Sequence, residues 1–412
     1  MILQRKEIEI MSPAGNFECL AAAIQGGADS VYFGAGNLNM RARSANNFTT
    51  DDLHEIAERC GEKSVKTYLT VNTVMFDSDM PAMREIIDAA GDAGISAVIA
   101  SDPATIMYAS ARGIEIHLST QINITNFESL RFYSQYADVA VLARELNLEQ
   151  VKHIYGQIVA HKLCGPGKNL IRLEMFAHGA LCMAVSGKCY LSLHEYNASA
   201  NRGSCYQVCR RSYIVTDKET GRELEVDNQY IMSPKDLCTI DFMDRMIEAG
   251  VRVFKIEGRA RSAEYVKTVT RCYSQAAEAI VSGSYTPEKT AAWKESLSTV
   301  FNRGFWDGYY LGKRLGEWSD KYGNKATKRK TYIGKVTNFF ANISVAEILI
   351  ESGELAVNGE ALIIGPTTGV MELTVKEIRV ELKPVDKSVK GEYCSVAVCD
   401  KVRRGDKVYL LT

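Results

Sequence analysis

The sequence predicts an α/β fold, a (β/α)8 TIM-like barrel with a cysteine-rich insertion, followed by a small all-β C-terminal domain. Short runs of β-branched and aromatic residues recur eight times over about 270 residues, and helix-like segments separate them. A (β/α)8 barrel typically occupies about 250 residues. Beyond residue 331 the pattern changes to alternating strands and turns. A doubly wound open sheet is the alternative, but no GxGxxG motif follows the first strand.

The barrel strands are predicted from apolar runs that end in small or polar residues. They span residues 8–13, 30–35, 66–73, 97–102, 114–120, 139–145, 173–179 and 252–258. Helices are predicted between them, most of them ending at glycine or another small residue, as helix C-termini commonly do. They cover residues 17–27, 51–61, 82–94, 104–113, 127–137 and 148–158. The C-terminal strands are predicted at residues 331–340, 343–350, 360–366, 371–382, 393–399 and 407–411.

Three regions follow from this reading. Residues 1–285 form the barrel, and the Cys-rich insertion at about 180–250 separates its last two strands by about 70 residues, where ordinary connections have about 2 to 6. Residues 286–330 form a helical extension and linker, with the basic stretch 321–330 as the linker itself. Residues 331–412 form a small β-barrel-like C-terminal domain.

Composition limits the partners and the compartment. The 412 residues carry 49 Lys and Arg against 50 Asp and Glu, so nucleic-acid binding would require a local basic patch. The N-terminus lacks a signal-peptide pattern, and no uncharged apolar run approaches the roughly 18 residues of a membrane span. We therefore expect a cytoplasmic protein without membrane contact. The 11 cysteines, an odd number, indicate reduced thiols or metal ligands instead of a disulfide framework.

Polar side chains gather at the carboxyl ends of the predicted strands. In a barrel these ends converge on one face, where active sites are built. Some of these residues could simply cap the following helices. The candidate site residues at the strand ends are Asn72, Gln121, Asn123, Arg144, Glu145, His178, Glu257 and Arg259.

The insertion contains four closely spaced cysteines. Cys182, Cys189, Cys205 and Cys209 follow a C-x6-C-x15-C-x3-C pattern. Four thiolates at this density can hold an iron–sulfur cluster or a structural zinc ion. Zinc sites usually have pairs of ligands about two to four residues apart, and only the second pair comes near this, so the spacing favours iron–sulfur. Four unrelated buried cysteines are the remaining alternative, and Cys238 is a possible substitute ligand.

Several long motifs resemble the peptidase U32 family, which is also called the collagenase-like protease family. They include MSPAGNFECLAAAIQGGADSVYFGAG, HLSTQINITN, VLARELNLEQV, FAHGALCMAVSGKCYLS, NRGSCYQVCR, SPKDLC and FKIEGRARSAEYV. The resemblance runs in order from about residue 8 to 275, and NRGFWDGYYLGK with the β-rich C-terminus extends it to nearly the whole chain.

The length and the short C-terminal domain look most like the tRNA hydroxylation protein branch of that family. This resemblance implies formation of 5-hydroxyuridine at the wobble position of tRNA, with dependence on prephenate. It implies a [4Fe-4S] cluster held by the four cysteines of the insertion. We expect Arg144 and Arg259 to hold anionic substrate and Glu257 or His178 to move a proton. The further substrate-binding candidates are Asn72, Gln121, Asn123, Glu145, Arg41 and Arg43.

Two other functions remain open. One is a peptidase acting on collagen-like or other peptides, as the family name says. The chain has no HExxH helix and no GxSxG elbow for such chemistry. The other is a non-catalytic adaptor with a structural cluster, whose β domain binds a protein partner. The electron donor, if one exists, is not indicated by the sequence.

Overall fold

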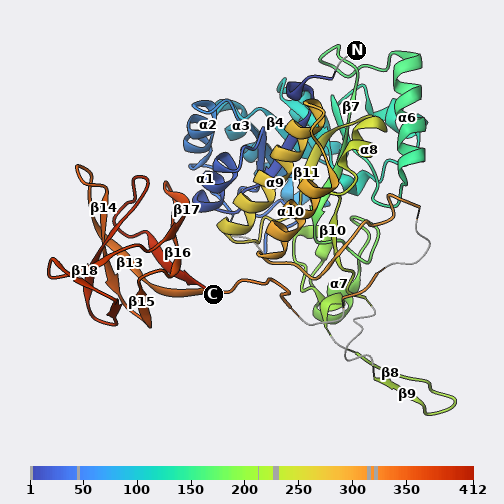
Figure 1. Ribbon diagram of the computed structural model, residues 1–412. Helices are drawn as coiled ribbons and strands as arrows, with labels where there is room; N and C mark the ends of the chain where they lie inside the picture. The colour runs from blue at the N-terminus through green and yellow to red at the C-terminus, as the bar shows by residue number, and fades with distance from the viewer. Residues whose placement is uncertain (1–2, 44–46, 212, 226–231, 313–316, 320–322) are drawn as a thin grey trace.

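The computed structural model describes residues 3–43, 47–211, 213–225, 232–312, 317–319 and 323–412. Figure 1 shows a barrel surrounded by helices, with the β-rich domain beside it. Residues 226–231 of the predicted insertion and residues 320–322 of the predicted linker region lie outside the described parts. No helix among the described residues is long and apolar enough to cross a membrane.

Eight parallel strands close into the predicted barrel. They are β1 (Glu9–Pro13), β2 (Ser30–Phe33), β3 (Lys66–Val71), β4 (Ala97–Ala100), β5 (Glu115–Leu118), β6 (Val139–Val141), β7 (Arg172–Gly179) and β11 (Val251–Ile256). Each strand pairs with its neighbour in chain order, and β11 pairs with both β7 and β1. This last pairing closes the barrel and excludes the open sheet.

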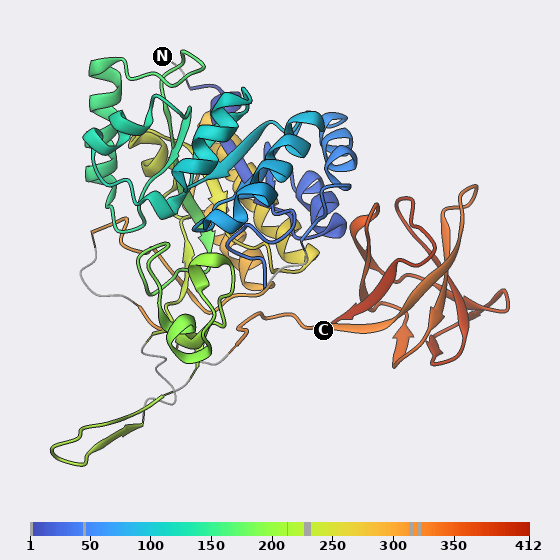
Figure 2. The ribbon, with the colours of Figure 1, turned by 180° about the vertical axis from the view of Figure 1, so that it is seen from behind.

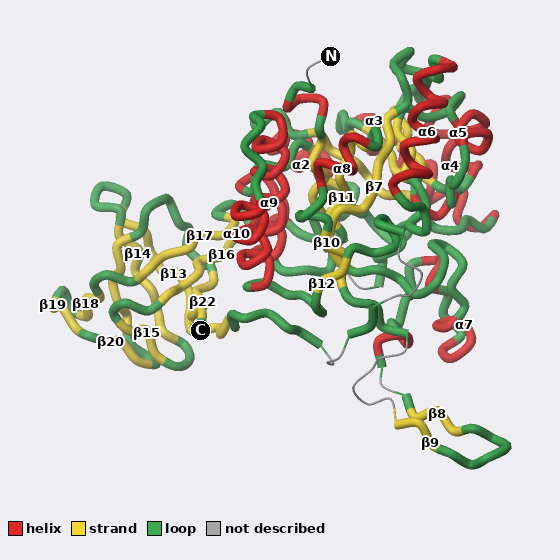
Figure 3. Tube along the Cα trace, turned by 45° about the vertical axis from the view of Figure 1, so that its right-hand side comes forward, coloured by secondary structure: helices red, strands yellow, loops and turns green. Residues whose placement is uncertain are grey.

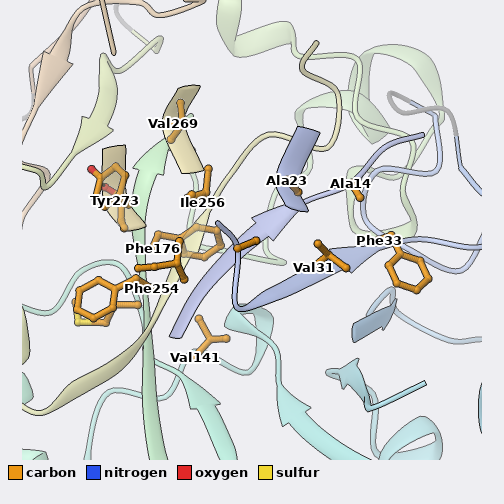
Figure 4. Packing of buried hydrophobic residues seen from close by; sticks show 14 of the residues in the cluster. Ala14, Ala23, Val31, Phe33, Val141, Phe176, Phe254, Ile256, Val269 and Tyr273 are labelled. Atoms are coloured by element: carbon orange, nitrogen blue, oxygen red, sulfur yellow. The ribbon is translucent and has the colours of Figure 1, made fainter. Parts of the chain in front are cut away.

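Helices cover the outside of the barrel (Figure 2). They are α1 (Phe17–Gln25), α2 (Leu53–Gly61), α3 (Met80–Asp92), α4 (Pro103–Ala111), α5 (Phe127–Tyr133), α6 (Leu148–His161), α8 (Met243–Glu248) and α9 (Ala263–Val281). Side-chain caps fix several starts; Asn16, for example, accepts a hydrogen bond from the Cys19 N–H at 2.8 Å. Their apolar faces pack on the strands, as Figure 4 shows for Val269 and Tyr273 of α9 near Ile256.

The insertion between β7 and β11 contains several short elements. They are α7 (Leu191–Tyr196), β8 (Ile214–Thr216), β9 (Glu223–Glu225) and β10 (Asp236–Cys238). Strand β10 runs antiparallel to the end of β7, with Cys238 opposite His178. The insertion therefore returns to the barrel at the carboxyl end of β7, beside the barrel mouth.

The expected helical extension is only partly correct. Helix α10 (Pro287–Ser298) forms within it, but Phe305–Trp306 form strand β12, which pairs in parallel with β10. The aromatic residues had suggested a helix, but Trp306 lies in a strand instead. Its side chain is 4% exposed, and its strand extends the sheet next to the insertion.

The C-terminal domain is all-β, as Figure 3 shows, and its strands pair antiparallel. Its strands are β13 (Lys330–Phe340), β14 (Val345–Ile350), β15 (Glu354–Ala356), β16 (Glu360–Gly365), β17 (Gly369–Thr374), β18 (Ile378–Val380), β19 (Lys383–Val385), β20 (Lys387–Val389), β21 (Tyr393–Ala397) and β22 (Lys407–Leu411). The predicted single strand at 371–382 is wrong, because the chain bends between β17 and β18. The domain has its own apolar core. It docks on α1 and α9, where Gln25 Nε2 donates to the Thr368 carbonyl at 2.8 Å.

Candidate functional site

A cavity of about 200 Å³ lies between the carboxyl ends of the barrel strands and the insertion. The strands contribute mostly polar and charged side chains to its wall, and the insertion contributes the four cysteines and several small or apolar residues. The candidates that line the cavity are Arg41, Asn72, Gln121, Arg144, Glu257, Arg259, Cys182, Cys189, Cys205 and Cys209. A space of this size can admit a single nucleobase or a small organic acid.

An arginine–carboxylate pair lies in the wall. Arg41 donates to Glu257 Oε1 from both Nε (3.1 Å) and Nη2 (2.6 Å). Burial alone would raise the pKa of Glu257, but the guanidinium groups of Arg41, Arg144 and Arg259 outweigh burial and lower the pKa to about 2. Glu257 is therefore a carboxylate at neutral pH, able to accept a proton or hydrogen bond but not to donate one.

Arg259 is held rigidly beside this pair. It is 5% exposed, and its Nη1 donates to Asn39 Oδ1 at 3.0 Å and to Thr70 Oγ1 at 2.9 Å. Burial lowers the pKa of Arg259 to about 10, which still leaves the guanidinium charged at neutral pH. Gly15 permits this arrangement, since a Cβ there would lie 2.1 Å from the Arg259 carbonyl oxygen.

Arg144 is the least satisfied cation in the wall. Its guanidinium lies over the Phe176 ring, 3.8 Å from the centroid, and its one side-chain hydrogen bond to a described residue reaches the Ala180 carbonyl oxygen at 3.4 Å. Its Nε is buried and has no partner among the described atoms. Because a buried donor without a partner is costly, this geometry suits an anionic ligand that would accept from Arg144.

The floor of the cavity contains a lysine that the sequence reasoning missed. Lys255, on β11, is 6% exposed and forms a 2.9 Å ion pair with Glu174 of β7, which is fully buried. Its Nζ also lies 4.6 Å from the Tyr32 ring centroid. The sequence could have revealed this lysine, because it lies between Phe254 and Ile256 in an apolar strand. Side chains alternate along a strand, so if Phe254 and Ile256 face the helices, Lys255 faces the barrel interior.

Two side-chain amides in the cavity wall form a hydrogen-bond network. The Asn72 Nδ2 group donates to Ser119 Oγ at 3.0 Å and to Gln121 Oε1 at 3.4 Å, and Ser119 Oγ also donates to Gln121 Oε1. Asn201 of the insertion lines the same cavity and is not among the site residues that the sequence predicted.

The four insertion cysteines line this one cavity, and their donor set fits a polynuclear cluster. Burial raises the pKa of Cys209 to about 11; Arg210 opposes this shift, and Cys182, Cys205 and Cys189 add to it. Among the residues with described placement, no three Cys, His, Asp or Glu side chains converge as a single metal ion requires. Four cysteine thiolates are ligands that both an iron–sulfur cluster and a structural zinc ion use.

Other candidates lie outside the cavity wall. His178 packs among the rings of Tyr265, Tyr273 and Phe305, with 1% exposure. Burial, with a contribution from Arg261, lowers the pKa of His178 to about 3. His178 does not line the cavity, because its ring faces Tyr265 and Tyr273 of the helix layer.

The remaining candidates surround the cavity. Asn123 donates to the Ser186 carbonyl at 3.0 Å and so ties the insertion to the end of β5. Glu145 is exposed and lines a neighbouring hollow. The Arg43 guanidinium lies over the Tyr206 ring, 3.9 Å from its centroid. Cys238 is buried on β10, and Tyr273 OH lies 4.0 Å from its sulfur. None of these four lines the main cavity.

Comparison with known proteins agrees with the resemblance seen in the motifs. Residues 15–320 match peptidase family U32. The chain is 62% identical over 403 residues to a protein named collagenase from Porphyromonas gingivalis W83, covering 98% of this chain and 97% of that protein. It is 33% identical over 343 residues to tRNA hydroxylation protein P1 of Bacillus subtilis, covering 81% and 78%.

A third relative modifies ribosomal RNA according to its name. The chain is 32% identical over 324 residues to the 23S rRNA 5-hydroxycytidine C2501 synthase of Escherichia coli, covering 77% of this chain and 47% of that protein. The family match begins just after β1 and spans the rest of the barrel, the insertion and the segment after it as far as residue 320. The chain is a member of peptidase family U32.

Proposed function

We propose that this protein is an iron–sulfur-dependent tRNA modification enzyme that forms 5-hydroxyuridine at the wobble position and depends on prephenate. One observation carries the proposal: four cysteines and the arginines of the barrel mouth line one cavity of about 200 Å³. Relatives named as tRNA hydroxylation proteins and as a 5-hydroxycytidine synthase support the choice of RNA as substrate and of hydroxylation as chemistry.

Cys182, Cys189, Cys205 and Cys209 would hold a [4Fe-4S] cluster in this proposal. Such a cluster, when bound, would supply one-electron redox chemistry next to the substrate. The protein's own residues determine what can bind beside it.

The cavity suits one extruded pyrimidine, and its wall also carries a cation that could bind a small anion. Enzymes that act on a base in a nucleic acid take it out of the stack into a pocket. The amide of Gln121, which Asn72 orients, would offer a hydrogen bond to the edge of that base. Arg144, with its unpartnered Nε, would hold a carboxylate of prephenate or a related dicarboxylate. Glu257, a carboxylate at neutral pH, would orient Arg41. Arg259 would contribute fixed positive charge.

Mass spectrometry of tRNA nucleosides tests this proposal. Cells lacking the gene would be complemented with the wild-type protein, with Cys205→Ala, or with Cys164→Ala as a matched control, because Cys164 is an exposed cysteine outside the cavity. We expect 5-hydroxyuridine derivatives to be restored by the wild type and by the control but not by Cys205→Ala. Unchanged nucleosides in the deletion strain, with no second relative in the genome, would reject the proposal.

A peptidase is the second candidate, because relatives with 62% and 56% identity are named collagenase. Among the described residues no cysteine hydrogen-bonds to a histidine, and His178 does not line the cavity. Hydrolysis of gelatin or of a collagen-like peptide by metal-free protein, abolished by one cavity substitution, would favour this candidate. An absence of cleavage together with loss of the tRNA nucleoside would reject it.

A further inference from the structure

The amide of Asn72 has a fixed orientation. The backbone N–H of Met40 donates to Asn72 Oδ1 at 3.3 Å, so the oxygen of this amide must face the backbone. The NH2 group of Asn72 consequently faces Ser119 and Gln121. Since an NH2 group cannot accept a hydrogen bond, the atom of Gln121 that lies nearest to it must be the carbonyl oxygen.

This constraint fixes the orientation of Gln121 in turn. Its Oε1 accepts from Asn72 Nδ2 and from Ser119 Oγ, so both lone pairs of that oxygen are used. Its Nε2 group makes no hydrogen bond within the part of the chain that is described, and Gln121 lines the cavity. Gln121 therefore offers a ligand hydrogen-bond donors but no free side-chain acceptor.

Two further contacts hold this side chain in place. A Cβ on Gly187 would lie 2.8 Å from Gln121 Cγ, so the glycine packs directly against the aliphatic part of the glutamine. The second contact holds the backbone beneath the side chain: Asn123 Nδ2 donates to the backbone carbonyl oxygen of Gln121 at 2.8 Å and to the backbone carbonyl oxygen of Ser186 at 3.0 Å. Contacts with the insertion thus hold Gln121 at the end of β5. The Nε2 group of Gln121 is therefore already oriented before a ligand binds.

The chemistry of this donor distinguishes two pyrimidines. Uracil carries a carbonyl oxygen at position 4, which accepts a hydrogen bond, whereas cytosine carries an amino group there, which donates one. The fixed NH2 group of Gln121 can donate to the oxygen at position 4 of uracil. With cytosine, the same NH2 group would face another hydrogen-bond donor. A site built for one hydrogen-bonding pattern discriminates strongly against a ligand that cannot complete it.

We propose that Gln121 is the specificity-determining residue that selects uracil over cytosine in this cavity. This inference rests on the proposed RNA-modifying function and deepens it by naming the base and the residue that reads it. One relative is named for 5-hydroxycytidine, so discrimination between the two pyrimidines is a meaningful property within the family.

Binding of short RNAs to the full-length protein, purified anaerobically, tests the inference. Two fluorescent anticodon stem–loops would differ only in uridine or cytidine at the wobble position, and anisotropy would give the ratio of their dissociation constants. The variants are Gln121→Glu, which keeps the Oε1 acceptor but replaces the donor with an acceptor, and Gln121→Leu, which removes both. Gln135→Glu makes the same charge change at an exposed position on the barrel surface and serves as the control.

We expect the wild type and Gln135→Glu to prefer the uridine loop by about tenfold, a typical effect of one hydrogen bond in a buried site. Gln121→Leu should bind the two loops about equally, and Gln121→Glu should prefer the cytidine loop. Circular dichroism of each variant checks folding, and the leucine variant provides a second test if the glutamate variant unfolds.

The outcomes distinguish a failure of the role proposed for Gln121 from a failure of the proposed function. If the wild type prefers uridine and both Gln121 variants keep that preference, the role of Gln121 is wrong while the proposed function stands. Equal wild-type binding of both loops also overturns the role of Gln121. If the wild type binds neither loop, the proposed function itself fails, and the inference fails with it.

Discussion

A buried carboxylate at the amino-terminal end of the barrel makes stability depend on pH. Glu9 accepts hydrogen bonds from Tyr68 OH at 2.6 Å and from Arg172 Nη1 at 2.7 Å. Burial alone would raise its pKa, but Arg172, His117, Lys66 and the Tyr68 hydrogen bond lower it from 4.5 to about 2. A native pKa below the unfolded value stabilises the protein above pH 4.5, and that stabilisation is lost as the pH falls toward 2.

The size of this effect follows from the two pKa values. The difference corresponds to about 3 kcal/mol at neutral pH, of which about 1.4 kcal/mol disappears between pH 6 and pH 3.5. Glu9→Gln removes the titrating group, so the variant should be less stable at pH 7 and lose about 1.4 kcal/mol less than the wild type over that interval.

Denaturant unfolding followed by tryptophan fluorescence measures this difference. All three tryptophans precede residue 331, so the signal reports on the barrel side of the molecule and not on the C-terminal domain. Glu149→Gln, at an exposed position, is the matched control and should follow the wild type. If Glu9→Gln and the wild type show the same pH dependence, the assignment of a low pKa to Glu9 is refuted.

Three other predictions concern the site. Cys205→Ala should reduce the iron of anaerobically purified protein from about four atoms per chain, and wild-type protein that contains stoichiometric zinc without iron would contradict the cluster. Lys255→Met should cost about 3 to 5 kcal/mol of unfolding free energy by leaving Glu174 charged and unpaired, and the double variant with Glu174→Leu should recover most of it in denaturant titrations. Gly15→Ala should displace the Arg259 backbone and reduce tRNA modification, measured by nucleoside analysis, although thermal unfolding shows a folded protein.

The sequence was sufficient to predict the strands of the barrel, because each is a short apolar run followed by a polar end and a helix. Every predicted strand from 8–13 to 252–258 overlaps an observed one. The same logic brought Asn72, Gln121 and Glu257 to one mouth, since parallel strands end on the same face. The cysteine spacing likewise indicated one cluster of thiols, and the structure places all four around one cavity.

His178 shows what local pattern could not determine. Side chains alternate along a strand, so a residue two positions after Phe176 should also face the barrel interior. The pairing of β7 with β11 shifts register, with Lys255 opposite Phe176 but Ile256 opposite His178. This irregularity turns His178 toward the helices. It depends on how two strands separated by about 70 residues pair, and no local sequence signal encodes it.

Lys255 and Gln121 depend on tertiary structure in the same way. The sequence placed Lys255 in a strand but could not show that Glu174, from another strand, would neutralise it beneath the cavity. It placed Gln121 at a strand end, but the direction of its amide is set by the Met40 backbone acting through Asn72. The sequence by itself determined which elements form and which polar groups end them. Only the closed barrel, with the insertion folded over its mouth, decided which of those groups face one another, because hydrogen bonding and charge pairing act between residues distant in the chain.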